Sequence, residues 1–163
     1  MAATPAVRVL DQAKVSYSLH EYDPDDGTAA AAQGAHGYGE VAVAALGADP
    51  DQVFKTLVTR VDGALTVAVV PVSGTLDLKA FAAAAGGRKA AMAEPADAER
   101  STGYVRGGIS PLGQRKALPT VVDDTALAFP TIMVSAGRRG LQVELSPTDL
   151  VRLTRARTAA IAR

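Results

Sequence analysis

The sequence has no cysteine and no tryptophan, and only 4% of its 163 residues are aromatic. The absence of cysteine excludes disulfide bonds, thiolate-bound metals and a cysteine nucleophile. Two histidines, His20 and His36, are too few for a histidine-rich metal site, so we expect neither a metal nor another cofactor. P-loop, dinucleotide-binding and His-Glu-x-x-His motifs are also absent, which argues against kinase, dehydrogenase and zinc-hydrolase chemistry.

Neither sign of charge dominates, because 17 basic side chains balance 17 acidic ones. A protein of this kind does not bind nucleic acid through its overall charge, so such binding would need a local basic patch. The sequence contains no long apolar run typical of a membrane span or an export signal. With 48% hydrophobic residues, the chain can bury one core. We therefore expect one domain over residues 1–163, located in the cytoplasm and not associated with a membrane.

Helix and strand signals alternate along the chain. Capping residues, first-turn prolines and terminal glycines predict helices over residues 4–14, 39–46, 77–85 and 95–100 and from residue 146 onward. Alternating or β-branched runs predict strands over residues 17–22, 54–61, 64–71, 120–122, 131–135 and 141–145. Turn residues at 62–63 and 137–140 predict two hairpins. The expected fold is an α/β domain with a mixed, hairpin-containing central sheet flanked by helices, and residues 23–37 are expected to form a loop or a frayed helical insert.

A loop at residues 100–113 contains four glycines, which indicates close backbone approach or unusual dihedral angles. Upstream, Lys55 interrupts an otherwise apolar strand, so its charge requires a binding partner or a functional role there. The N–H groups of Gly107 and Gly108 could hold a carbonyl oxygen that becomes negative, and the Lys55 ammonium could add electrostatic stabilisation. The alternative is a lysine that reaches water beside a turn that simply needs glycine.

Ser110 lies in a segment that only partly matches the nucleophile elbow of hydrolases. Leu112 replaces the closing glycine, and Pro111 removes a backbone N–H. We therefore interpret the Ser110 hydroxyl as a turn group that binds nearby backbone, and not as a nucleophile.

Several motifs occur together in one order: FKTL at 54–57, PVSG at 71–74, LDLK at 76–79, the loop at 100–113, VS at 134–135 and RGL at 139–141. In this order they resemble the YbaK-type Cys-tRNA(Pro) deacylases, relatives of the editing domain of prolyl-tRNA synthetase. The resemblance covers nearly the whole chain. It implies a proofreading enzyme that removes cysteine from mischarged tRNA(Pro), with Cys-tRNA(Cys) as a second candidate substrate and prolyl-tRNA synthetase as a candidate transient partner. It also implies that the substrate thiol attacks its own ester, so that no protein nucleophile is needed.

The resemblance assigns roles to individual residues. Lys55 corresponds to the essential lysine, which would contact the aminoacyl ester or the adjacent ribose and phosphate, and Gly107 and Gly108 would line the carbonyl. Ser135 would orient the substrate amine or thiol. The substrate-binding positions implied in this way are Tyr22, Tyr38, Thr56, Ile109, Ser110 and Ser135. Without the resemblance, both tyrosines would be interpreted as half-buried core residues.

Two features depart from the family pattern. Gln142 stands where an acidic residue is expected, although a neutral amide still accepts a hydrogen bond. The segment 26–37 is longer than expected and could alter the rim of the pocket. Three alternatives remain open: a deacylase for another amino acid such as alanine, a non-catalytic module that binds tRNA or a synthetase, and a small-molecule ester or amide hydrolase.

Overall fold

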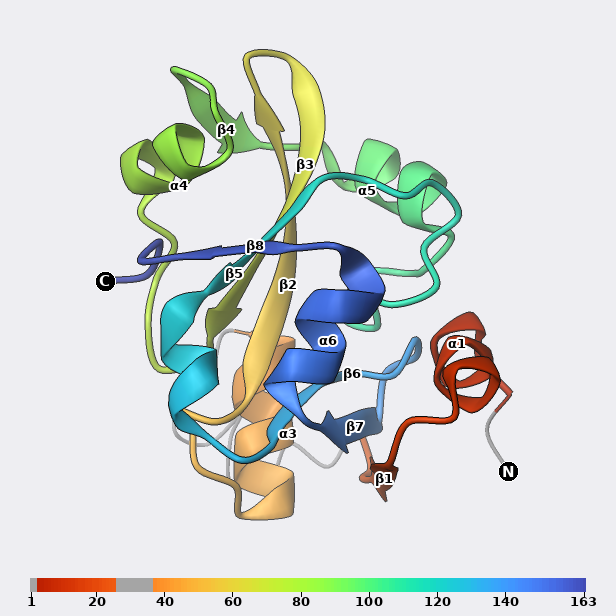
Figure 1. The fold of residues 1–163 in the computed structure, drawn as a ribbon. Helices are drawn as coiled ribbons and strands as arrows, with labels where there is room; N and C mark the ends of the chain where they lie inside the picture. Colours follow the sequence, from red (N-terminus) through yellow and green to blue (C-terminus); the bar gives the residue numbers. More distant parts are fainter. Residues whose placement is uncertain (1–2, 26–36) are drawn as a thin grey trace.

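The computed structural model describes residues 3–25 and 37–163, so most of the predicted insert lies outside the described residues. The helices are α1 (Pro5–Ala13), α3 (Tyr38–Leu46), α4 (Leu78–Ala84), α5 (Pro95–Thr102), the 3-10 helix η1 (Asp124–Ala128) and α6 (Pro147–Thr154). The strands are β1 (Tyr17–Glu21), β2 (Phe54–Val61), β3 (Ala64–Pro71), β4 (Ala90–Met92), β5 (Thr120–Asp123), β6 (Ile132–Ser135), β7 (Leu141–Leu145) and β8 (Arg157–Ala159). Figure 1 shows the long β2–β3 hairpin running through the middle of the molecule.

The strands form two sheets, which confirms the α/β class and the mixed sheet. The larger sheet has the order β4-β2-β3-β5-β8, with antiparallel pairs on the β4 side and parallel pairs on the β8 side. The smaller sheet, β1-β7-β6, is antiparallel throughout. Its separation from the larger sheet was not predicted. The two sheets meet at an isolated parallel bridge between Val53 and Met133, where the Met133 N–H donates to the Gln52 carbonyl at 3.0 Å.

Local sequence signals fix most element boundaries. The Thr4 hydroxyl accepts a hydrogen bond from the Val7 N–H at 3.2 Å, and Pro5 begins the first turn of α1. The hairpin between β2 and β3 turns at Asp62 and Gly63, both with positive φ of 50° and 87°. These starts and turns agree with the predictions from the sequence.

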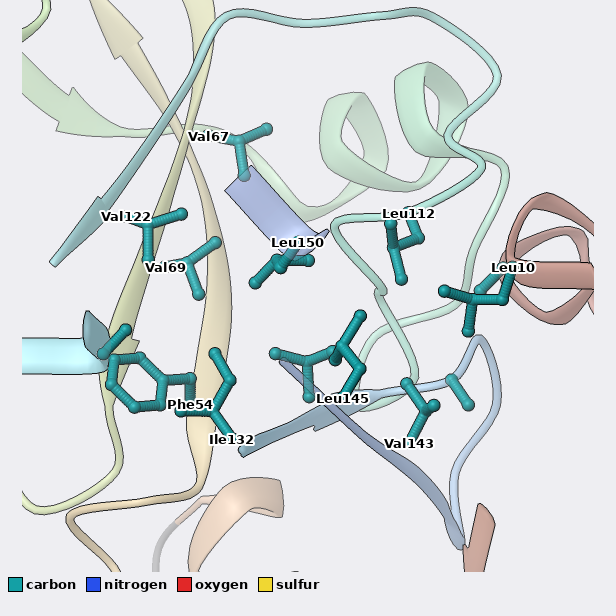
Figure 2. Close-up of a cluster of buried hydrophobic side chains, with 14 of the residues drawn as sticks. Leu10, Phe54, Val67, Val69, Leu112, Val122, Ile132, Val143, Leu145 and Leu150 are labelled. Atoms are coloured by element: carbon teal, nitrogen blue, oxygen red, sulfur yellow. The ribbon is translucent and has the colours of Figure 1, made fainter. Parts of the chain in front are cut away.

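The main core lies between the two sheets and α6. Leu150 of α6 is fully buried and packs in one cluster with Ile132 of β6, Leu145 of β7 and Val69 of β3, as Figure 2 shows. Helix α1 closes the far end of this cluster through Leu10. Because successive residues of a strand point to opposite faces, alternate residues of β3 contribute to a second cluster around α4. The larger sheet is therefore covered on both faces.

The sequence patterns did not predict β4, η1 or β8. The three residues of β8 are exposed or half-buried and carry no apolar alternation. Backbone contacts hold this segment instead, because it pairs with β5 and the buried Asp123 carboxylate accepts hydrogen bonds from the Ile161 and Ala162 N–H groups at 2.9 Å each. Within residues 3–25 and 37–163, no helix is both long and apolar enough to cross a membrane.

Candidate active site

The site begins at an unpaired stretch of the β2 edge. Strand β4 pairs only with Thr59–Val61, its ladder ending at the hydrogen bond from the Ala93 N–H to the Val58 carbonyl at 3.1 Å. At the other end, β6 reaches this edge only near Val53. The Val58 carbonyl therefore faces this edge of β2. Alternate residues of a strand direct their N–H and C=O groups to the same edge, so the backbone of Thr56 also faces this edge, in the gap between β6 and β4.

A pocket of about 580 Å³ lies along this gap, a volume in the range of small-molecule sites. Its walls come from both sheets, from α3 and α5, and from the glycine loop at 100–113. The lining residues are Gly37, Tyr38, Gly39, Glu40, Val53, Phe54, Lys55, Thr56, Leu57, Val58, Val72, Met92, Ala93, Pro95, Ala98, Glu99, Arg106, Gly107, Ile109, Ser135 and Gln142. Most of this surface is apolar, so its few polar groups decide what binds.

Three of its side-chain polar groups are buried or half-buried and have no partner among the described residues. Lys55 is half-buried, and its ammonium forms no ion pair within the described part of the chain. Thr56 Oγ1 and Gln142 Oε1 are buried and have no hydrogen-bond partner among the described residues. Leaving buried polar atoms unpaired is unfavourable, and such exceptions concentrate at functional sites. The pocket therefore presents the half-buried Lys55 ammonium and two buried oxygen atoms to a ligand, beside the exposed Arg106.

The glycine loop is held over the pocket by three neighbouring elements. The Glu99 carboxylate of α5 accepts a hydrogen bond from the Arg106 N–H at 2.7 Å. On the other side of the same residue, Arg139 Nε donates to the Arg106 carbonyl at 2.7 Å. The third contact comes from α3, where the Tyr38 ring lies so close to Gly107 that a Cβ there would meet ring carbons at 2.7–2.8 Å. Gly107 also has φ of +87°, so both space and dihedral angle require glycine.

Six of the nine predicted site residues line this one pocket: Lys55, Gly107, Tyr38, Thr56, Ile109 and Ser135. They come from α3, β2, β6 and the glycine loop, which are far apart in the sequence. The structure therefore brings together the lysine and the glycine loop on which the sequence interpretation depended.

Gly108, Ser110 and Tyr22 do not line the pocket. The Gly108 N–H, which we had expected to face a carbonyl oxygen, donates to the Val105 carbonyl at 2.9 Å and closes a turn. Ser110 is fully buried, and its hydroxyl accepts from the Leu112 N–H at 3.2 Å, as the turn interpretation predicted. Tyr22 is half-buried, and its N–H pairs with the Gly140 carbonyl at 3.0 Å in the extension of the smaller sheet.

The structure adds Gln142 to the site, which the sequence interpretation treated only as a departure. Gln142 lies directly opposite Ser135 in the β6–β7 register and is 6% exposed. The alternation of β7 predicts only that the Gln142 side chain points away from the main core. Its burial depends on neighbours distant in sequence, so no local pattern could have revealed it.

Beside Gln142, the same sheet face carries a paired carboxylate. Glu144 Oε1 contacts His20 Nε2 at 2.9 Å, and Glu144 Oε2 accepts a hydrogen bond from the Thr131 hydroxyl. The hydroxyl and the imidazole hold the pKa of Glu144 below its ordinary value. Across the described ranges, no group of three or more histidine, cysteine, aspartate or glutamate side chains could hold a metal ion.

Comparison with known proteins identifies the family. Residues 33–153 match the model of the aminoacyl-tRNA editing domain. The chain is also 39% identical over 160 residues to an Enterococcus faecalis protein named "Putative Cys-tRNA(Pro)/Cys-tRNA(Cys) deacylase EbsC", covering 97% of this chain and 92% of that one. The chain belongs to the aminoacyl-tRNA editing domain family.

Solved structures show the same fold. A crystal structure described as "a putative trans-editing enzyme for prolyl tRNA synthetase" superposes with a TM-score of 0.79 at 24% identity, covering 100% of this chain and 99% of that chain. The crystal structure of hypothetical protein APE2540 gives a TM-score of 0.82 at 23% identity, with coverage of 98% and 99%. The fold is therefore shared across distant sequences.

Proposed function

We propose that this protein is a trans-editing deacylase that removes cysteine from mischarged tRNA(Pro), with Cys-tRNA(Cys) as a second substrate. The observation that carries the proposal is the pocket itself, which combines the unpaired Lys55 ammonium with the Gly107 loop at a strand edge. The name of the Enterococcus faecalis relative supports the same substrate class.

The chemistry of the pocket favours a nucleophile supplied by the substrate. The chain has no cysteine, and none of the described lining residues is a histidine that could activate the Ser135 or Thr56 hydroxyl. In the proposed reaction, the cysteine sulfur bonds to its own ester carbonyl carbon and the bond from that carbon to the ribose oxygen breaks. The thiol proton ends on the ribose oxygen, and the products are a cyclic thiolactone and free tRNA.

Each lining group has a part in this scheme. Lys55 stabilises the negative charge that develops on the carbonyl oxygen or holds the terminal ribose and phosphate, and the Gly107 N–H donates to the same oxygen. Thr56, Gln142 and Ser135 accept hydrogen bonds from the amino and thiol groups, while Tyr38 and Ile109 border the entrance and wall. We assign no substrate contact to Gly108, Ser110 or Tyr22, because they lie outside the pocket.

The remaining parts of the proposal concern the partners. We propose that residues 1–163 act as one editing domain in the cytoplasm, on mischarged tRNA and in transient contact with prolyl-tRNA synthetase. A second site that destroys a wrong product is needed because a synthetase pocket separates small side chains by only about 1–3 kcal/mol per methylene.

Deacylation of Cys-tRNA(Pro), Ala-tRNA(Pro) and S-methylcysteinyl-tRNA(Pro) tests the proposal, with wild type, Lys55→Ala and Lys79→Ala. We expect rapid loss of cysteine alone, no loss of the S-methylated residue, and a decrease of roughly 10²- to 10³-fold in Lys55→Ala. Lys79 is an exposed lysine of α4 outside the pocket, so its variant should match wild type.

Each other result has a defined meaning. Preferential loss of alanine would show that alanine, and not cysteine, is the amino acid that the protein removes. Loss of the S-methylated residue at the same rate as cysteine would exclude attack by the substrate thiol. If wild type left all three esters intact, the deacylase proposal would be wrong and a binding module would be the better interpretation.

A further inference from the structure

We propose that Arg139, which lies outside the pocket, is a positioning residue that aims the Gly107 N–H at the reacting carbonyl. The proposal rests on the proposed function, in which this N–H is a donor to the carbonyl oxygen. Its starting point is that Arg139 does not line the pocket, whereas Arg106, Gly107 and Tyr38 do.

The orientation of one peptide group carries the argument. In a trans peptide the C=O and the following N–H point in opposite directions from one plane. Arg139 Nε donates to the Arg106 carbonyl at 2.7 Å, and this carbonyl belongs to the same peptide as the Gly107 N–H. Arg139 fixes the direction in which the Arg106 carbonyl points. It thereby also fixes the direction of the Gly107 N–H, which points away from Arg139.

The Gly107 N–H is available for such a role. It forms no hydrogen bond with any residue in the described ranges, whereas the Gly108 N–H is used in the turn to Val105. Of the two glycine donors that the sequence suggested, only the one held by Arg139 remains for a ligand. The donation from a guanidinium also polarises the peptide and strengthens its N–H as a donor.

Arg139 holds the peptide through a second contact. Its guanidinium carbon lies 4.8 Å from the centroid of the Tyr38 ring, and the ring in turn packs against Gly107. The Arg139 side chain therefore fixes both the carbonyl before Gly107 and the aromatic ring beside it. Among the described residues, the neighbouring Arg138 makes no comparable contact, because its side-chain hydrogen bonds, to Arg139 O and Glu21, are both 3.5 Å long.

The two arginines provide a matched experiment. Steady-state deacylation of Cys-tRNA(Pro) would be measured for wild type, Arg139→Met, Arg139→Lys and Arg138→Met, with thermal melting to verify folding. We expect Arg139→Met to lower kcat roughly 10- to 100-fold with KM nearly unchanged, a fraction of the loss typical of a missing oxyanion donor. Arg139→Lys should recover part of kcat, since an ammonium can still donate to the Arg106 carbonyl. Arg138→Met should leave kcat unchanged.

A direct readout of the Gly107 amide separates this inference from the proposed function. In assigned ¹H–¹⁵N spectra, Arg139→Met should shift the Gly107 resonance and speed its hydrogen exchange, while Arg138→Met should not. If wild type is inactive on every ester but this amide response occurs, the proposed function fails and the positioning stands. The inference is overturned if Arg139→Met leaves the Gly107 amide unaffected. It is also overturned if Arg139→Met and Arg138→Met raise KM alike at constant kcat, because Arg139 then serves only to contact the tRNA.

Discussion

Replacing Gly107 by alanine tests whether the close contact with Tyr38 matters. Two penalties act at this position: φ is +87°, and the new Cβ would lie 2.7–2.8 Å from three ring carbons of Tyr38. Gly63 provides a matched control, because its φ is also +87° and nothing lies within 4 Å of a Cβ there. An alanine in this conformation costs about 1–2 kcal/mol, which is the full effect expected for Gly63→Ala.

At Gly107 the steric contact adds to the dihedral cost. Overpacking a well-packed core costs typically about 1–3 kcal/mol, but the Tyr38 ring is 42% exposed and can move, so we expect Gly107→Ala to destabilise the protein by the low end of that range, about 1 kcal/mol more than Gly63→Ala. Urea unfolding of both variants measures the difference. In a Tyr38→Ala background the contact is gone, so Gly107→Ala should then cost only the dihedral penalty.

The same variants predict the kinetics. Because the Tyr38 ring and the glycine loop must move apart, Gly107→Ala should lower the kcat of deacylation at least tenfold. Gly63 lies in a hairpin turn outside the pocket, so Gly63→Ala should leave kcat unchanged. Equal free energies of unfolding for the two alanine variants, together with unchanged kcat in Gly107→Ala, would refute the reasoning.

Three further changes have defined outcomes. Gln142→Leu should leave thermal stability equal or higher, since it removes a buried acceptor without a partner among the described residues, yet should lower the rate of deacylation. Asp123→Ala should cost about 2–5 kcal/mol in urea unfolding, because it leaves the buried N–H groups of Ile161 and Ala162 unpaired. Glu144→Gln should be less stable than wild type in urea unfolding at neutral pH, because folding lowers the pKa of Glu144 and so favours its charged form. This difference in stability should shrink as the pH falls below the ordinary glutamate pKa of about 4.3.

Much of the fold could be predicted because local signals and tertiary structure agree. The turn at Asp62 and Gly63 and the cap at Thr4 each depend on a few adjacent residues. Strand β8 could not be predicted, since it is held by pairing with β5 and by the Asp123 carboxylate, both more than thirty residues away in sequence. The way the two sheets meet depends likewise on contacts between residues distant in sequence, among them the bridge between Val53 and Met133.

The residues that line the candidate pocket were predicted in part, but their geometry was not. A lysine in an apolar strand and a run of glycines identify Lys55 and Gly107, because both residue types are unusual in those settings. Which glycine N–H remains available cannot be predicted, since the answer depends on a turn hydrogen bond to Val105. The contribution of Arg139 is hidden for the same reason: in sequence it is one of two adjacent exposed arginines.

Buried polar atoms give an independent argument for the location of the site. Elsewhere in the described structure, buried polar side chains such as Thr59, Ser110 and Asp123 have hydrogen-bond partners. The two buried oxygens without one, Thr56 Oγ1 and Gln142 Oε1, come from different sheets and line the same pocket. Folding alone favours partners for both atoms, so their coincidence in one cavity supports a polar ligand there, one that donates a hydrogen bond to Gln142 Oε1. The amino group of either aminoacyl ester is such a donor, and the thiol of a cysteinyl ester adds a second donor that the methyl side chain of an alanyl ester lacks.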